Sequence, residues 1–390
     1  MITRHNMSVV TLIVARYQAS TVMGKLMADG VHHVLLNNAR GTLIRDQWYQ
    51  SLLPMISPEL TVLQMLVPDP LVDSVMEKAA RHAQLHRSGA GAVFSQPCAD
   101  LHLKGDLPLW PLDEAERPEE DASTSLRENL TAIFLISQGE KTDAVCRAAM
   151  QAGGHGPVVQ YSDGHGLRER LGWLRITRKP VKEVVCVIVD NVDANLVFAA
   201  MAQAGQVERA ARGLIYRMPV QKGLVAIDSV YAGSRHAASA QQIIRAIDDL
   251  KGNKDWRAQN AIGARGGATA GLDFMPALES RPEDRSLLSV LVERERARST
   301  ALALINAGAP GANIDYLHSH VRDEGLSHEQ LAHIRVVLDR EPAAELEARA
   351  LELFDEVIVY TQPVTQLETY ALPQQGQPAR RYRGARVGAE

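Results

Sequence analysis

Residues Leu60–Pro97 read LTVLQMLVPDPLVDSVMEKAARHAQLHRSGAGAVFSQP, and this stretch decides the fold. Its first part, Leu60–Val67, is almost continuously apolar and includes β-branched residues, which predicts a buried strand. The motif Pro68–Pro70 ends that strand. We expect Asp69 to cap a following helix, with Pro70 in the first helical turn.

The helix predicted after this motif spans Leu71–Arg87. Its apolar residues recur at helical spacing, and an apolar stripe of this kind must be covered by a sheet. The glycine loop Ser88–Gly91 is expected to end the helix, and Ala92–Ser95 begins a second strand. The stretch therefore predicts a strand, a helix, a glycine loop and a strand, in that order.

The same stretch resembles the P-II family of nitrogen regulatory proteins. That family has V-P-D-x-L-V-D-x-V between a strand and a helix, then G-x-G before K-I-F-V-S-P. The residues of this chain that stand in register are Val67, Pro68, Asp69, Leu71, Val72, Asp73, Val75, Gly89, Gly91, Phe94, Ser95 and Pro97. Upstream, Gly24–Val31 resembles the end of the family's first helix, and Asn38–Gly41 resembles its entry to the long loop before the third strand.

One order of elements, strand-helix-strand-strand-helix-strand, recurs three times along the chain. The first pass is expected at Ser8–Ala15, Ser20–Asp29, His33–Asn38, Leu60–Val67, Leu71–Arg87 and Ala92–Ser95. The second is expected at Leu130–Ser137, Thr142–Ala152, Pro157–Tyr161, Val181–Val189, Asp193–Ala204 and Gly213–Pro219. The third is expected at Ser286–Glu293, Ser299–Ala307, Asn313–His318, Ala332–Leu338, Ala343–Phe354 and Glu356–Thr361.

This order predicts an α+β chain of three tandem ferredoxin-like (βαββαβ) domains. Two helices cover one face of such a sheet, so something else must cover the other face. Proteins of the P-II family form trimers whose sheets pack around an axis, and the resemblance therefore implies a single-chain pseudo-trimer. The alternative, three independent domains on a string, would leave apolar sheet faces exposed.

The expected domains are residues 7–105, 129–232 and 285–372. An acidic, proline-rich linker occupies 106–128, and a basic, flexible tail occupies 373–390. Residues 233–284 form an insertion without a counterpart in the other passes. Within it, Ala237–Leu250 has the pattern of an amphipathic helix, and a glycine-rich run comes after it.

Composition limits the class of protein. A net charge of −4 and a pI near 6.4 give no indication of nucleic-acid binding. The cysteines lack metal-binding spacing and suit a reducing compartment, and they are Cys98, Cys146 and Cys186. We find no signal pattern at the N-terminus and no apolar run long enough to span a membrane. We therefore expect a cytoplasmic protein with no transmembrane segment.

The resemblance also implies ligand contacts, because P-II proteins bind adenine nucleotide between subunits. The glycine loop supplies backbone amides to the phosphates, and glycine lets the backbone approach them closely. The matching positions are Arg40, Gly41, Gly89 and Gly91 in the first pass, and the equivalent turn of the second pass holds Arg209, Arg212 and Gly213. The chain departs from the family pattern at Ala92, where a lysine is expected. The alternative is that the glycines only form a turn.

Two further clusters could bind ligands. Asp163, Gly164 and His165 open a loop whose basic run, residues 168–179, could accept an anion or form a solvated face. In the third pass, His318 and His320 alternate along a strand and could share a transition metal with a nearby carboxylate. Ordinary surface or capping histidines are the alternative.

The sequence thus predicts a non-catalytic regulatory protein. It would sense a small anionic metabolite, such as bicarbonate, or an adenine nucleotide (ATP, ADP or AMP) in clefts between its domains. Binding would change its affinity for a partner protein, either a membrane transporter or a metabolic enzyme. The alternatives are an enzyme that uses His165, Asp163 and neighbouring arginines, and a scaffold whose clefts bind nothing. We expect a monomeric pseudo-trimer.

Overall fold

The structure is a computed structural model of the whole chain. It describes residues 1–45, 58–105, 126–137, 139–166, 181–209, 213–227, 230–232, 247, 250–252, 285–321 and 329–369. Arg212, the basic run 168–179, the tail and almost all of the expected helix at 237–250 lie outside the described residues.

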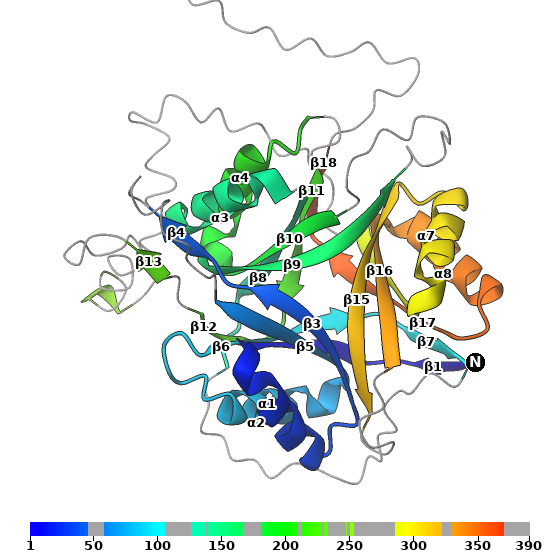
Figure 1. Cartoon of the computed structure of the whole chain (residues 1–390), viewed down its shortest axis with the longest axis horizontal. Coiled ribbons are helices and arrows are strands. Elements are labelled where there is room, and N and C mark those ends of the chain that lie inside the picture. Colours follow the sequence, from blue (N-terminus) through cyan, green and yellow to red (C-terminus); the bar gives the residue numbers. More distant parts are fainter. Residues whose placement is uncertain are drawn as a thin grey trace, which may run out of the picture.

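The described residues form a mixed α/β structure with one large antiparallel sheet and six α-helices (Figure 1). The first segment contains β2 (Met7–Ala15), α1 (Arg16–Ala28), β3 (His33–Arg40), β5 (Glu59–Pro68), α2 (Val72–His82) and β6 (Gly91–Cys98). The second contains β8 (Leu130–Ser137), α3 (Thr142–Gln151), β9 (His155–Gly166), β10 (Val181–Asp190), α4 (Asn191–Gly205) and β11 (Gly213–Val220). The third contains β14 (Arg285–Glu293), α7 (Ala297–Asn306), β15 (Gly311–Val321), β16 (Glu329–Asp339), α8 (Arg340–Leu353) and β17 (Val357–Val364).

The strand order is the same in all three segments. In each, the first strand lies between the third and the fourth, and the second strand lies outside the third. The orders are β3-β5-β2-β6, β9-β10-β8-β11 and β15-β16-β14-β17, with every neighbouring pair antiparallel. The predicted element order is confirmed, with bounds that differ by a few residues.

Short strands that sequence reasoning did not predict join the segments. After the first segment, β7 (Leu101–Lys104) pairs with β17 of the third. After the third, β18 (Gln366–Thr369) pairs with β11 of the second, and after the second, β12 (Gly223–Ala226) pairs with β6 of the first. The second strands β3, β9 and β15 also pair with one another. The result is one sheet of 16 strands, which includes β1 (Ile2–Arg4) beside β7.

Two short strands lie outside this sheet. β4 (Leu43–Arg45) and β13 (Val230–Ala232) form a parallel pair of their own. They bring the chain after the second segment next to the chain that leaves β3.

Each helix pair covers the sheet face of its own segment. Figure 1 shows α1 with α2, α3 with α4, and α7 with α8 at the periphery and strands in the middle. The faces that the helices leave bare contact one another, since one core cluster contains buried side chains from all three segments, among them Phe94, Phe134, Tyr216, Leu287 and Val337. Burial of a large apolar side chain contributes about 1.5–3 kcal/mol, so these contacts are a major source of stability.

Two local predictions were wrong. Helix α2 ends at His82 rather than Arg87, because Gln84 adopts a left-handed conformation with φ of 54°. The amide of Leu85 then donates to the carbonyl of Ala80 at 2.9 Å, which closes the helix in the manner of a Schellman motif and buries the Leu85 side chain. Asp69 does not cap this helix; it lies in a 3-10 turn, and its carboxylate accepts a hydrogen bond from the Ser8 hydroxyl at 2.7 Å.

Candidate functional site

The predicted residues Asp163 and Gly164 lie where the second and third segments meet. The end of strand β9 pairs with β15, which places Asp163 opposite Ile314 and Gly164 opposite Asn313, while Asp163 also pairs with Val181 of β10. His165 also lies at this end of β9, opposite Ala312. Residues that are far apart in the sequence therefore form one junction.

At this junction, Tyr316 of β15 is surrounded by charged side chains. The guanidinium carbon of Arg294 lies 4.6 Å from the centre of the Tyr316 ring, a cation–π distance. Burial, together with the negative charge of Asp163 and a hydrogen bond to it, raises the pKa of Tyr316, while Arg294 and Arg298 oppose the rise. We call Asp163, Tyr316, Arg294 and Arg298 the Tyr316 junction.

The Tyr316 junction carries a net positive charge, with two guanidinium groups and one carboxylate. Arg294 precedes α7 and Arg298 lies in its first turn, where the helix dipole also favours negative ligands. Both arginines are exposed. An exposed guanidinium group that lies over an aromatic ring can stack on a flat ligand, and a second guanidinium beside it can pair with an anionic group.

Arg40 was predicted to contact the phosphates of a nucleotide, but in the structure it lies beside two carboxylates. Its Nη2 lies 3.4 Å from Glu183 Oε2 and 3.5 Å from Asp143 Oδ1, both of the second segment. Burial acts to lower the pKa of Arg40, but the two carboxylates outweigh it and the pKa is raised. Its neighbour Gly41 donates its amide to the carbonyl of Pro58 at 2.7 Å. An anion would have to compete with both carboxylates for Arg40.

The predicted glycines all have structural contacts. Gly91 has φ of +140°, and a Cβ there would lie 2.0 Å from the carbonyl oxygen of Ile13. Gly213 is equivalent, with φ of +135° and 1.9 Å to the Ile136 carbonyl oxygen. The Gly89 amide donates to the carbonyl of Ala226 in β12 at 2.7 Å. These contacts account for the glycines as turn and strand-start residues.

The remaining predicted ligands are dispersed. Arg209 is exposed, and its Nε lies 3.9 Å from the neighbouring Glu208 carboxylate. His318 is exposed while His320 is buried, so they do not present a common open face. Within the described residues, no group of three or more His, Cys, Asp or Glu is arranged to hold a metal ion. The metal site at these histidines stays a prediction.

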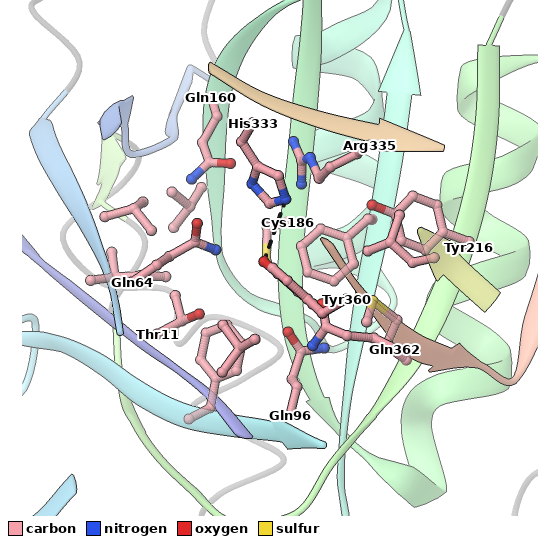
Figure 2. A pocket seen from close by; sticks show the side chains of 18 residues that line it. Thr11, Gln64, Gln96, Gln160, Cys186, Tyr216, His333, Arg335, Tyr360 and Gln362 are labelled. Atoms are coloured by element: carbon pink, nitrogen blue, oxygen red, sulfur yellow. Dashed lines mark hydrogen bonds between the residues drawn. The ribbon is translucent and has the colours of Figure 1, made fainter. Parts of the chain in front are cut away.

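A cavity of about 30 Å³ lies where the bare sheet faces of the three segments meet (Figure 2). Its lining combines apolar side chains with the half-buried Gln64 and with buried polar ones, among them Gln96, Gln160, Tyr216, His333 and Arg335. Sequence reasoning missed this site. The available signal was polar residues at inward-facing positions of apolar strands, such as Arg335 within Ala332–Leu338.

The cavity wall contains a buried ion pair. Arg335 Nη2 lies 2.6 Å from Asp315 Oδ2, and both side chains are buried. Burial raises the pKa of Asp315, against the opposing effect of Arg335. Nearby, the Tyr360 hydroxyl lies 3.4 Å from His333 Nε2, and burial lowers the pKa of His333 well below its usual value. His333 is therefore neutral at physiological pH.

The buried thiols are poor nucleophiles. Burial raises the pKa of Cys146 to about 11 and that of Cys186 to about 12. Burial also raises the pKa of Cys98. Thiolate is the reactive form, so burial disfavours that form at each of these cysteines.

Comparison with known proteins adds little. No protein family profile matches the sequence, and no curated protein does. Among solved structures, the crystal structure of aspartate kinase from Synechocystis matches 92% of this chain at 11% identity and a TM-score of 0.19. The chain spans 44% of that kinase, and similarity at this level supports no argument about fold or activity. Among the described helices, none is long and apolar enough to cross a membrane.

Proposed function

We propose that this chain is a P-II-like regulatory protein, built as a single-chain pseudo-trimer of three ferredoxin-like domains. It binds a small anionic metabolite or an adenine nucleotide between domains and thereby modulates a partner transporter or metabolic enzyme. The proposed domain bounds are 7–105, 129–232 and 285–372.

One observation carries this proposal, namely the cyclic pairing of the short strands. The first segment gives β7 to the third, the third gives β18 to the second, and the second gives β12 to the first. Each segment thus receives one strand and donates one, as expected for a closed ring of three equivalent units. Such a ring has a junction between each pair of units, and an effector bound there contacts both.

Of these junctions, the Tyr316 junction best suits an anionic effector. Its two accessible arginines favour negative charge, and the exposed guanidinium of Arg294, which lies over the Tyr316 ring, is a planar group on which adenine could stack. By contrast, the junction at Arg40 already contains two carboxylates. Asp163 and the arginines lie on different segments, so an effector that contacts both would change how the segments and their loops fit together.

The test is calorimetric titration of the full chain with ATP, ADP, AMP and bicarbonate. We expect at least one of them to bind, and the double variant Arg294→Gln/Arg298→Gln to weaken its binding at least tenfold. That loss corresponds to about 1.4 kcal/mol or more, within the range for charged hydrogen bonds. The matched control is Arg349→Gln, which removes an exposed arginine of the same segment, paired with Glu352 at 2.8 Å, and should leave binding unchanged.

Two outcomes would overturn the proposal. If none of these compounds binds, the scaffold alternative is favoured. If a bound nucleotide is turned over during the titration, an enzyme with Asp163 and His165 in its active site is favoured instead.

A further inference from the structure

The cavity between the three segments is asymmetric, although the strands around it are in equivalent register. On the third strands of the three segments, Gln64, Cys186 and Arg335 occupy equivalent positions. Each is paired with an equivalent residue of the first strand, namely Thr11, Phe134 and Ser289 in the same order. On the fourth strands, the equivalent residues are Phe94, Tyr216 and Tyr360. A single guanidinium group therefore stands at a position where the other two segments have neutral side chains.

Several polar groups of the cavity wall that can donate a hydrogen bond have no acceptor. Within the described residues, the unpaired donors that line the cavity are Arg335 Nε, Gln96 Nε2 and the Tyr216 hydroxyl, while Arg335 Nη2 is paired with the Asp315 carboxylate. Each of these side chains is more than nine-tenths buried. A buried donor without an acceptor costs roughly 1–3 kcal/mol, and more when the group is charged, so several at one cavity indicate a missing acceptor.

Arg335 and Tyr216 act on one another. The positive charge of Arg335 lowers the pKa of the Tyr216 hydroxyl, although burial is the larger influence and raises that pKa to about 12. The hydroxyl is therefore protonated and available as a donor. Figure 2 shows Arg335 and Tyr216 on one side of the cavity and Gln96 across from them, beyond Tyr360.

We propose that this cavity binds one monatomic anion, of the size of chloride or bromide, through Arg335 and Tyr216, with Gln96 on the opposite wall. An acceptor that carries a full negative charge satisfies several donors at once. The carboxylate of Asp315 lies beside Nη2 of Arg335 and leaves Nε without an acceptor, so the ion pair alone does not satisfy the guanidinium.

Size limits the ligand. A cavity needs roughly 10–15 Å³ to hold one water-sized body, so this cavity of about 30 Å³ holds at most about two. A halide, alone or with one water molecule, fits that space. Sulfate, phosphate and nucleotides do not fit, so this site is separate from the effector site proposed at the Tyr316 junction.

The test combines crystallography and thermal unfolding of the full chain. Crystals grown in sodium bromide should show an anomalous bromide peak at Arg335 and Tyr216. Protein freed of chloride should gain stability with added chloride or bromide along a saturable curve, because a ligand of the folded state stabilises it by mass action. Sodium sulfate at the same ionic strength should not reproduce that curve.

Two variants copy residues that the chain itself uses at equivalent positions. Tyr216→Phe reproduces Phe94 and removes only the hydroxyl, and we expect it to weaken halide binding at least fivefold. Arg335→Gln with Asp315→Asn reproduces Gln64 and Asn37, and it should abolish both the bromide peak and the saturable stabilisation. Phe134→Leu keeps every donor and is the control for altered packing.

The proposal is overturned if ordered water without bromide fills the cavity, or if sulfate stabilises the protein as well as chloride does. It is also overturned if Tyr216→Phe and the double variant both keep the halide response of the unaltered protein. These readouts are independent of nucleotide or bicarbonate binding, so the two proposals can fail separately.

Discussion

The guanidinium of Arg335 lies 2.6 Å from the carboxylate of Asp315, and both side chains are almost completely shielded from solvent. The two strands that carry them, β16 and β15, are neighbours in the sheet. The same register positions in the first segment hold Gln64 and Asn37. One segment therefore uses a buried ion pair where another uses two neutral amides.

The buried ion pair predicts that the effects on stability of replacing Arg335 and of replacing Asp315 are strongly coupled. Arg335→Gln or Asp315→Asn alone leaves one buried charge without its partner and should reduce the free energy of unfolding by about 3–5 kcal/mol. The double variant should recover most of that loss, because it removes both charges and places at these positions the neutral residues that the first segment has there. Urea unfolding of the four proteins completes a double-mutant cycle. Losses that simply add would contradict the prediction.

Gly91 should not tolerate a side chain. A Cβ at its φ of +140° would lie 2.0 Å from the Ile13 carbonyl oxygen, so Gly91→Ala must displace a strand of the core. We expect a loss of roughly 2 kcal/mol or more in urea unfolding. Gly24→Ala is the control, since Gly24 lies in α1 with nothing within 4 Å of its added Cβ and should gain about 0.5–1 kcal/mol. Equal effects of the two changes would refute this account.

The apolar periodicity of the sequence was sufficient to predict the helices and long strands that the structure describes in the three segments. Leu130–Ser137, for example, matches β8 at both ends, because a buried strand with eight consecutive buried residues has an unmistakable composition. The helix end at His82 was missed because it depends on a left-handed Gln84, a residue with no strong preference for that conformation. Local patterns thus identify elements better than they identify ends.

The joining strands and the cavity could not be predicted in the same way. β7 has only four residues, and its pairing with β17 is a contact across more than 250 positions of sequence. Arg335 was visible inside an apolar strand, but whether an inward-facing charge meets a partner depends on strands of other segments. The predicted Asp163 and Gly164 do lie at a junction, whereas their neighbours Tyr316 and Arg294 come from parts of the chain that no local motif connects to them.

His33 makes stability depend on acidity. Burial, and then the nearby His320, lowers the pKa of His33 to about 4 from an ordinary value of 6.5. The unfolded chain therefore binds a proton that the folded chain does not between those values, and stability falls as pH falls from 6.5 toward 4. For His33 alone, the loss in free energy of unfolding approaches about 3 kcal/mol as the pH reaches about 4.

The measurement is the urea midpoint of the unaltered protein and of His33→Gln between pH 4 and 7. Glutamine keeps a hydrogen-bonding group near the Ser319 hydroxyl, which His33 Nε2 contacts at 2.7 Å, but it does not titrate. The variant should lose less stability on acidification than the unaltered protein. His86→Gln, at an exposed position, should retain the original pH dependence. Parallel pH curves for all three proteins would exclude His33 as a contributor.

Leu101 provides a test of whether the segments unfold as one unit. It belongs to β7 and is 1% exposed, in a cluster with Leu291 and Ile358 of the third segment. Leu101→Ala should reduce the free energy of unfolding by about 2–5 kcal/mol, because it leaves a cavity between two segments. Since the strands form a closed ring of contacts, we expect the whole transition to move to lower urea while remaining a single step by circular dichroism and by the absorbance of the buried tyrosines Tyr216 and Tyr360. Leu302→Ala, on the exposed side of α7, should shift the midpoint little. A separate early transition in Leu101→Ala would mean that the segments are independent domains on a string, and the pseudo-trimer would have to be abandoned.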